Sequence, residues 1–355
     1  MIVLNCNNLL SSLNATVYQV PPLPEDMTSF GDDAPQQVAT KVNLDYEISV
    51  ENWKSIPTLP SQANDPRLPR TFVDGALNSV EIAGSVQDSM GYARSIRAGQ
   101  LGVGAINLDT PDSSTILCSY LMAVTTMGYT ASQLTPLKND LQNHPREFSL
   151  ITWEATSDAY FKTLEDQEIA VRDFVTVRGR LRRRVTDVML EHERDLVRHI
   201  SLPIYADGRY VNHSPLDNKQ LVIGVIKSMR RRYLDLPRLQ VLYNLKPGER
   251  TPAFEMQSHK LKVISFYARI SSTVGGATNG IVRVEVGKNH FESYQHQDWT
   301  LLNAITAHMT QLRTKDSTYT RAAVTLEPIQ VIEQRMQRLF HPIERVSMSA
   351  LNALR

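Results

Sequence analysis

Two apolar, strand-like runs that each end in an Asp-Gly pair constrain the fold of this chain more than any other feature. The first, "TFVDG", ends on Asp74 and Gly75, and the second, "YADG", contains Asp207. A long stretch of helical character lies between them, from about Glu168 to His199. Strands on either side of a helix favour a sheet with that helix packed on it. The sequence therefore predicts a mixed α/β fold with a central mixed sheet flanked by helices.

The remaining elements are predicted from hydrophobic periodicity and from turn residues. Apolar runs bounded by Gly, Pro or Asn predict strands, and apolar residues three or four positions apart predict helices. Strands are expected at residues 71–74, 79–85, 101–108, 202–208, 220–227, 262–271 and 280–287, and helices at about 168–199, 299–312 and 327–340. The Asp-Gly pair at residues 74–75 would form a turn between the first two strands.

The chain divides into three regions by composition. Residues 1–66 are rich in Pro and Asp, which predicts a short N-terminal helix followed by an irregular extension. Residues 67–340 would form the main domain, with a mixed insertion at about residues 112–165. Residues 341–355 would form a C-terminal tail.

Composition and charge restrict the classes of function. The formal net charge is only +1 at pH 7, so any affinity for nucleic acid must come from local basic clusters. The two cysteines, Cys6 and Cys118, lack metal-ligand spacing, which favours a reducing compartment. No apolar run approaches the roughly 20 residues that span a bilayer, and the first residues lack the features of a signal peptide. We therefore expect a cytoplasmic protein that does not enter a membrane.

The two aspartates are candidate ligands of a divalent cation. If their strands are neighbours, Asp74 and Asp207 converge at one edge of the sheet, and a helix acid would complete a site for Mn²⁺ or Mg²⁺. Such sites hold the attacking and leaving oxygens in phosphodiester hydrolysis. The helix acid is either Glu191 or Glu193; Glu193 flanks the core-facing stripe, whereas Glu191 points further toward solvent. A single Asp-Gly pair, however, is most often a plain turn.

Basic residues near these motifs are candidates for contacts with nucleic acid. Lys227 ends an apolar strand and would contact the scissile phosphate. Two arginine runs would contact the phosphate backbone independently of sequence, namely Arg182, Arg183 and Arg184, and Arg230, Arg231 and Arg232. The alternative interpretation is that these arginines face solvent or pair with neighbouring acids and do not contact nucleic acid.

The order of these motifs resembles that of the NurA nuclease family. The strand "VDGA" is similar to the DGS signature of the family, and "YADGR" is similar to its second Asp-Gly motif. "LVIGVIKS" follows, with Lys227 at the position of a characteristic lysine. "FYARIS" and "IVRVEV" are similar to the C-terminal strand pair. The resemblance covers roughly residues 70–336.

The resemblance implies an RNase H-like core and a ring-shaped homodimer. It also implies manganese-dependent cleavage of DNA, as a 5′-to-3′ exonuclease and a single-strand endonuclease. The implied partner is a HerA-like hexameric ATPase, in DNA end processing, DNA repair or phage defence. Asp74 and Asp207 would be metal ligands; the spacing of the family favours Glu191 as the helix acid, and the apolar stripe favours Glu193.

Departures from the family pattern leave more than one function open. Ala76 replaces the serine of the DGS signature, and Glu327 stands where the Tyr-x7-His element, which begins at Tyr319, requires histidine. A carboxylate also binds a hard cation, so Tyr319 and Glu327 remain candidate catalytic residues. The alternatives are a catalytically inactive subunit that lines a DNA channel or docks the ATPase, and a structural protein of a mobile element.

Overall fold

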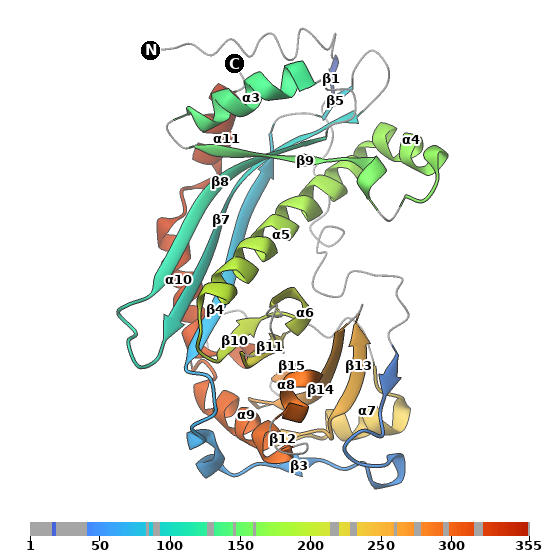
Figure 1. The fold of residues 1–355 in the computed structure, drawn as a ribbon, viewed down its shortest axis with the longest axis vertical. Coiled ribbons are helices and arrows are strands. Elements are labelled where there is room, and N and C mark those ends of the chain that lie inside the picture. The colour runs from blue at the N-terminus through green and yellow to red at the C-terminus, as the bar shows by residue number, and fades with distance from the viewer. Residues whose placement is uncertain are drawn as a thin grey trace.

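The fold is that of a computed structural model, drawn in Figure 1. It describes residues 16–18, 41–82, 85–87, 93–125, 131–144, 147–158, 161–213, 220–227, 233–258, 261–272, 278–293, 298–315 and 322–353. The short N-terminal helix expected before residue 16 lies outside the described residues. None of the described helices combines the length and the apolar character that a membrane span requires.

A mixed sheet of 12 strands runs through the described part of the molecule. Its strands are β2 (Val42–Asn43), β3 (Ile56–Pro57), β4 (Thr71–Glu81), β7 (Ile96–Asn107), β8 (Thr115–Thr125), β9 (Phe148–Trp153), β10 (Ile204–Asp207), β11 (Val222–Ile226), β12 (Glu249–Arg250), β13 (Phe254–Ser258), β14 (Leu261–Arg269) and β15 (Ile281–Gly287). A second, small sheet contains β1 (Thr16–Tyr18), β5 (Ser85–Gln87) and β6 (Ala93–Arg94).

The strand order of the large sheet confirms the mixed α/β fold. The main path runs β2-β13-β14-β15-β11-β10-β4-β7-β8-β9, with β12 and β3 attached to β14. At its centre, β4, β7 and β8 are antiparallel, whereas β10 is parallel to both β4 and β11. Within this path, β10 lies between β11 and β4. The strands that carry Asp74 and Asp207 are therefore direct neighbours.

The helices pack on both faces of this sheet, as expected. They are α3 (Ala131–Gln142), α4 (Leu164–Arg172), α5 (Phe174–His199), α6 (Tyr210–His213), α7 (Leu236–Tyr243), α8 (Lys288–Ser293), α9 (Trp299–Leu312), α10 (Glu327–Leu339) and α11 (Ile343–Ala353). The single helix expected at residues 168–199 is two helices, because the Asp173 side chain accepts hydrogen bonds from the first amides of α5. The segment expected as a C-terminal tail contains α11.

The first Asp-Gly pair does not form the expected turn. The strands expected at residues 71–74 and 79–85 are one strand, β4, which pairs with β7 without interruption from Thr71↔Asn107 to Glu81↔Arg97. A long partner strand keeps both residues of the pair extended, so the turn preference of Asp-Gly is overridden. Residues 115–125, expected within an insertion, form β8 and extend the same sheet.

Helices α5 and α10 lie on opposite faces of β4 and β7 (Figure 1). Asp74 pairs with Gly104 of β7, and a methyl group at Gly104 would lie 2.7 Å from Ile332 Cγ2 of α10. The next residue, Gly75, faces the other way: a methyl group there would overlap the carboxylate of Glu193 on α5. Successive residues of a strand point to opposite faces. The Asp74 side chain is therefore on the face that α10 covers.

Candidate metal centre

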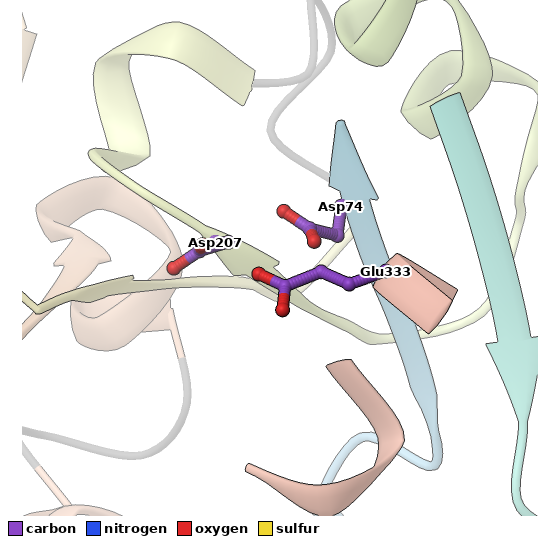
Figure 2. A group of neighbouring side chains, drawn as sticks. All are labelled: Asp74, Asp207 and Glu333. Carbon is purple, nitrogen blue, oxygen red and sulfur yellow. The ribbon is translucent and has the colours of Figure 1, made fainter. Parts of the chain in front are cut away.

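Three carboxylates from distant parts of the chain meet at the centre of the sheet. Asp74 comes from β4, Asp207 from the end of β10 and Glu333 from α10, and Figure 2 shows the side chains gathered together. One oxygen of each lies within 4.8 Å of the others. Among the described residues, this is the group of acids whose oxygens lie close enough together to hold one cation. The structure thus brings together the two aspartates expected from the sequence and adds a third acid that was not expected.

The register between β4 and β10 explains why the two aspartates meet. The pairs Tyr205↔Phe72 and Ala206↔Val73 place Asp207 next to Asp74 along two parallel strands. Parallel strands in this register point equivalent side chains to the same face. Phe72 and Tyr205 stack on that face with ring centroids 5.1 Å apart, and each ring precedes the aspartate of its strand by two residues. The local sequence of each strand therefore places its aspartate on the same side.

The second Asp-Gly pair, unlike the first, ends its strand. Gly208 has φ 100°, a left-handed conformation that residues with a Cβ seldom adopt. Its amide donates to the Val225 carbonyl at 2.8 Å, which holds the turn against β11. The carboxylate of Asp207 is consequently presented where the strand stops, with its side chain 21% exposed.

Glu333 reaches the site because it lies on the buried face of α10. It follows Ile329 by four residues and precedes Met336 by three, and both of these side chains are fully buried. Positions with this spacing share one face of a helix. Our sequence reasoning missed Glu333 because the acid was sought on the helix before Asp207. A carboxylate within an otherwise apolar helical stripe is the feature that would have indicated it.

Lys227 lies at the same cluster, as its position after β11 suggests. Its ammonium group donates to Asp207 Oδ2 at 2.8 Å and lies 4.0 Å from Glu333 Oε1, with the side chain 6% exposed. Burial alone would lower the pKa of Lys227, but Asp207, Asp74 and Glu333 together raise it above its ordinary value. The lysine is therefore charged and offsets part of the negative charge of the three acids.

Asp74 is the most buried of the three acids, at 3% exposure. Burial, followed by the charges of Asp207 and Glu333, raises its pKa well above the ordinary range, and Lys227 acts in the opposite direction. Its Oδ2 atom is buried and has no hydrogen-bond partner among the described residues. A buried polar atom without a partner is costly. A cation bound between the acids would remove that cost.

The neighbouring Glu333 responds to the same environment. Burial raises its pKa, Asp207 raises it further, and Lys227 lowers it. Carboxylate oxygens are the ligands that Mg²⁺, Mn²⁺ and Ca²⁺ prefer. The donor set of three carboxylates, one with an unsatisfied buried oxygen, therefore fits a hard divalent cation.

Neither glutamate expected on α5 joins the cluster. Glu191 is 51% exposed at its side chain and pairs with Arg184 at 2.9 Å. Glu193 is buried at 3%, but it lies against Gly75 on the opposite face of the sheet from Asp74. The physical reason is that α5 covers one face, whereas both aspartates point to the other, which α10 covers.

The remaining candidate residues lie elsewhere. Glu327 is exposed in the first turn of α10, six residues before Glu333. Tyr319 and the run Arg230, Arg231 and Arg232 fall outside the described residues. Histidine can also bind a divalent cation, but His308, which is buried on α9, is not part of the acid group. Its Nδ1 atom lies 3.1 Å from the hydroxyl oxygen of Tyr205.

The arginines of α5 are engaged with other parts of the chain. Arg184 pairs with Glu191, and Arg183 lies 3.9 Å from Asp187. Arg182 is near the buried Arg97, whose pKa is lowered to about 10 by burial and by this neighbouring charge. Because α5 covers the face opposite the acids, these arginines are not on the Asp74 face of the sheet.

Comparisons with known proteins add little to this geometry. No protein-family model matches the sequence, and no curated protein matches it. Among solved structures, the chain is similar to the Endonuclease V of Bacillus subtilis, with 11% sequence identity, a TM-score of 0.29, and coverage of 80% of this chain and 84% of that chain. A likeness this weak indicates neither a shared fold nor a shared activity. The functional proposal therefore depends on the acid cluster.

Proposed function

We propose that the chain is a divalent-metal-dependent nuclease that hydrolyses phosphodiester bonds in DNA. The observation that carries this proposal is the cluster of Asp74, Asp207 and Glu333, whose ligand oxygens lie within 4.8 Å of one another. The buried, unpartnered Oδ2 of Asp74 supports it, because such an atom is suited to a ligand that the chain does not provide. DNA as the substrate follows the resemblance to NurA.

Each residue of the cluster has a distinct part in this proposal. Asp74, Asp207 and Glu333 would hold Mn²⁺ or Mg²⁺, which supplies an activated water and neutralises phosphate charge. The buried strands β4 and β10 keep the two aspartates in place without substrate. Lys227, charged and hydrogen-bonded to Asp207, adds positive charge beside the acids that favours an anionic phosphate.

Metal binding and cleavage by matched variants test the proposal. Calorimetry with Mn²⁺ and cleavage of end-labelled single-stranded DNA would be measured for the unmutated protein, for Asp74→Asn and for Asp109→Asn. Asp109 is an exposed aspartate that pairs with Arg70, away from the cluster. We expect binding and Mn²⁺-dependent cleavage in the unmutated protein and in Asp109→Asn, and loss of both in Asp74→Asn. Cleavage that survives in Asp74→Asn would contradict the proposal.

A second candidate function is a catalytically inactive subunit that binds DNA or docks an ATPase. The position of Lys227 favours it, because its ammonium already pairs with Asp207 at 2.8 Å and supplies one positive charge to the cluster. In that case the unmutated protein binds no Mn²⁺, and Lys227→Met exposes a weak metal site without producing cleavage. Under the nuclease proposal, Lys227→Met instead binds Mn²⁺ several-fold more tightly and cleaves more slowly, because like charges repel.

The finer assignments follow the NurA resemblance and are part of the same proposal. They are 5′-to-3′ exonuclease and single-strand endonuclease activity, preference for Mn²⁺, a homodimer, a cytoplasmic location and a HerA-like ATPase partner in DNA repair or phage defence. Substrates labelled at the 5′ or the 3′ end give the polarity, and analytical ultracentrifugation gives the oligomeric state. Release of label first from 3′ ends, or a monomer at all concentrations, would contradict these assignments.

A further inference from the structure

A buried histidine lies directly behind the acid cluster and bonds to the main chain of one of its aspartates. His213, the last residue of α6, is 1% exposed, and its Nε2 atom lies 2.9 Å from the carbonyl oxygen of Asp207. A carbonyl can only accept, so Nε2 carries the proton of this hydrogen bond. The imidazole therefore fixes the peptide unit between Asp207 and Gly208, where β10 ends.

Glu193 lies between this histidine and the strand that carries the other aspartate. Its Oε2 atom lies 3.8 Å from His213 Nδ1, and its Oε1 atom occupies the space that a side chain at residue 75 would need. Gly75 is the neighbour of Asp74 in β4, and its lack of a side chain allows the carboxylate to lie against the strand. Glu193 thus contacts β4 on one side and His213 on the other.

Two further hydrogen bonds hold α6 in place around this pair. Arg194, next to Glu193 on α5, donates from Nε to the Asn212 carbonyl at 3.0 Å. The amide of Tyr210 donates to Glu285 Oε2 at 3.0 Å, and Glu285 is fully buried on β15. The segment after Asp207 is consequently attached to both α5 and the sheet, on the face opposite the three acids.

We infer that Glu193 and His213 are positioning residues, which fix the backbones of β4 and β10 so that Asp74 and Asp207 stay at metal-binding distance. This inference rests on the proposed function for its metal, but the backbone effect exists without metal. It also assigns Glu193 a role different from direct ligation. Residues that orient ligands typically change metal affinity by about 10- to 100-fold when they are removed.

Amide hydrogen exchange tests the backbone effect in the metal-free full-length protein. The probe is the Gly208 amide, which bonds to Val225 next to the peptide unit that His213 holds. We expect His213→Leu to raise its exchange rate about tenfold or more, and His213→Gln, which restores a donor, to stay within about threefold of the unmutated protein. The matched control is His290→Leu, which removes another buried histidine, on α8.

Calorimetry with Mn²⁺ provides the second measurement on the same variants. His213→Leu should weaken Mn²⁺ binding about tenfold and Glu193→Gln several-fold, while His290→Leu and His213→Gln bind as the unmutated protein does. Should His213→Leu fail to fold, His213→Asn replaces it, because its shorter amide does not reach the Asp207 carbonyl. The same tenfold changes are expected of it.

Each outcome decides the inference. Exchange at Gly208 that is the same in His213→Leu as in His290→Leu overturns it. A loss of Mn²⁺ affinity in Glu193→Gln as large as that in Asp207→Asn also overturns it, because Glu193 would then be a ligand. If the unmutated protein binds no Mn²⁺, the proposed function fails, whereas the exchange rates still support or reject the positioning role.

Discussion

The two Asp-Gly pairs have the same sequence and nearly the same function in the proposed site, but their backbones differ completely. Asp74-Gly75 lies inside the uninterrupted strand β4, whereas Asp207-Gly208 ends β10 in a left-handed turn. Residue 75 must be glycine because the Glu193 side chain fills the space that a Cβ atom would need. Residue 208 favours glycine because its φ is positive. A dipeptide thus indicates where an acid and a glycine lie in the chain, while the partner strand decides the conformation.

The difference also affects the environment of each acid. Asp74, held in mid-strand, is nearly fully buried and its pKa is raised well above the ordinary range by burial and by Asp207. Asp207, at the strand end, is partly exposed and bonds to Lys227. The two acids should therefore act alike toward a metal and oppositely toward the stability of the metal-free protein.

The largest expected effect is the one that the two pairs share. Asp74→Asn and Asp207→Asn should each lower Mn²⁺ affinity by at least about 100-fold, because each removes a charged ligand of the cluster. Isothermal titration calorimetry measures it, with Asp109→Asn as control. A large effect in only one of the two would show that the pairs do not share a cation.

Substitution of the third acid, Glu333, tests on which face of the sheet Asp74 and Asp207 bind the metal. Glu333→Gln should weaken Mn²⁺ binding by about tenfold or more, because Glu333 lies with both aspartates on the α10 side. Glu327→Gln, on the same helix but exposed, should change affinity by less than about twofold. The reverse order of effects would support the ligand position implied by the NurA resemblance and contradict the structure.

Substitution of the two glycines tests whether residue 75 is glycine because of a close side chain and residue 208 because of its backbone conformation. Gly208→Ala should cost about 1–2 kcal/mol of unfolding free energy, because an L-residue is strained at its positive φ. Gly75→Ala should cost about 1–3 kcal/mol through overlap with Glu193. Urea unfolding measures both. Adding Glu193→Ala should relieve the cost at residue 75 and leave that at residue 208 unchanged; equal coupling at both sites would contradict this.

The smallest effect is a difference in sign in the metal-free protein. Asp74→Asn should raise the unfolding free energy at pH 7 by about 1 kcal/mol, since it removes a carboxyl group whose ionisation is disfavoured by burial and by two neighbouring acids. Asp207→Asn should lower it by a similar amount, because Lys227 loses its partner at 2.8 Å. Thermal unfolding in the presence of a chelator measures both changes.

The pH dependence of this difference follows from the raised pKa of Asp74. An acid whose pKa is higher in the folded state stabilises the fold while it is protonated, and this stabilisation is lost as the pH rises through the folded-state pKa. The advantage of Asp74→Asn should therefore grow from acidic pH upward. An advantage that is constant with pH would show that Asp74 ionises normally.

Much of the sheet could be predicted from local patterns. The strands at residues 202–208, 220–227, 262–271 and 280–287 and the helices near residues 299–312 and 327–340 agree with β10, β11, β14, β15, α9 and α10 to within a few residues. Periodicity of apolar residues suffices here because each segment is bounded by turn residues. The prediction failed where long-range pairing overrides a local preference, as at the Asp-Gly turn of residues 74–75.

The candidate site was only partly predictable for the same reason. Asp74, Asp207 and Lys227 follow apolar strands, so the sequence by itself determined that they lie in or next to buried strands. The tertiary structure alone decided the third acid, Glu333 on α10 in place of a glutamate on α5. A shift of one residue in strand register moves every side chain to the other face. Because register depends on partner strands far away in the sequence, no local pattern could show which helix the two aspartates face.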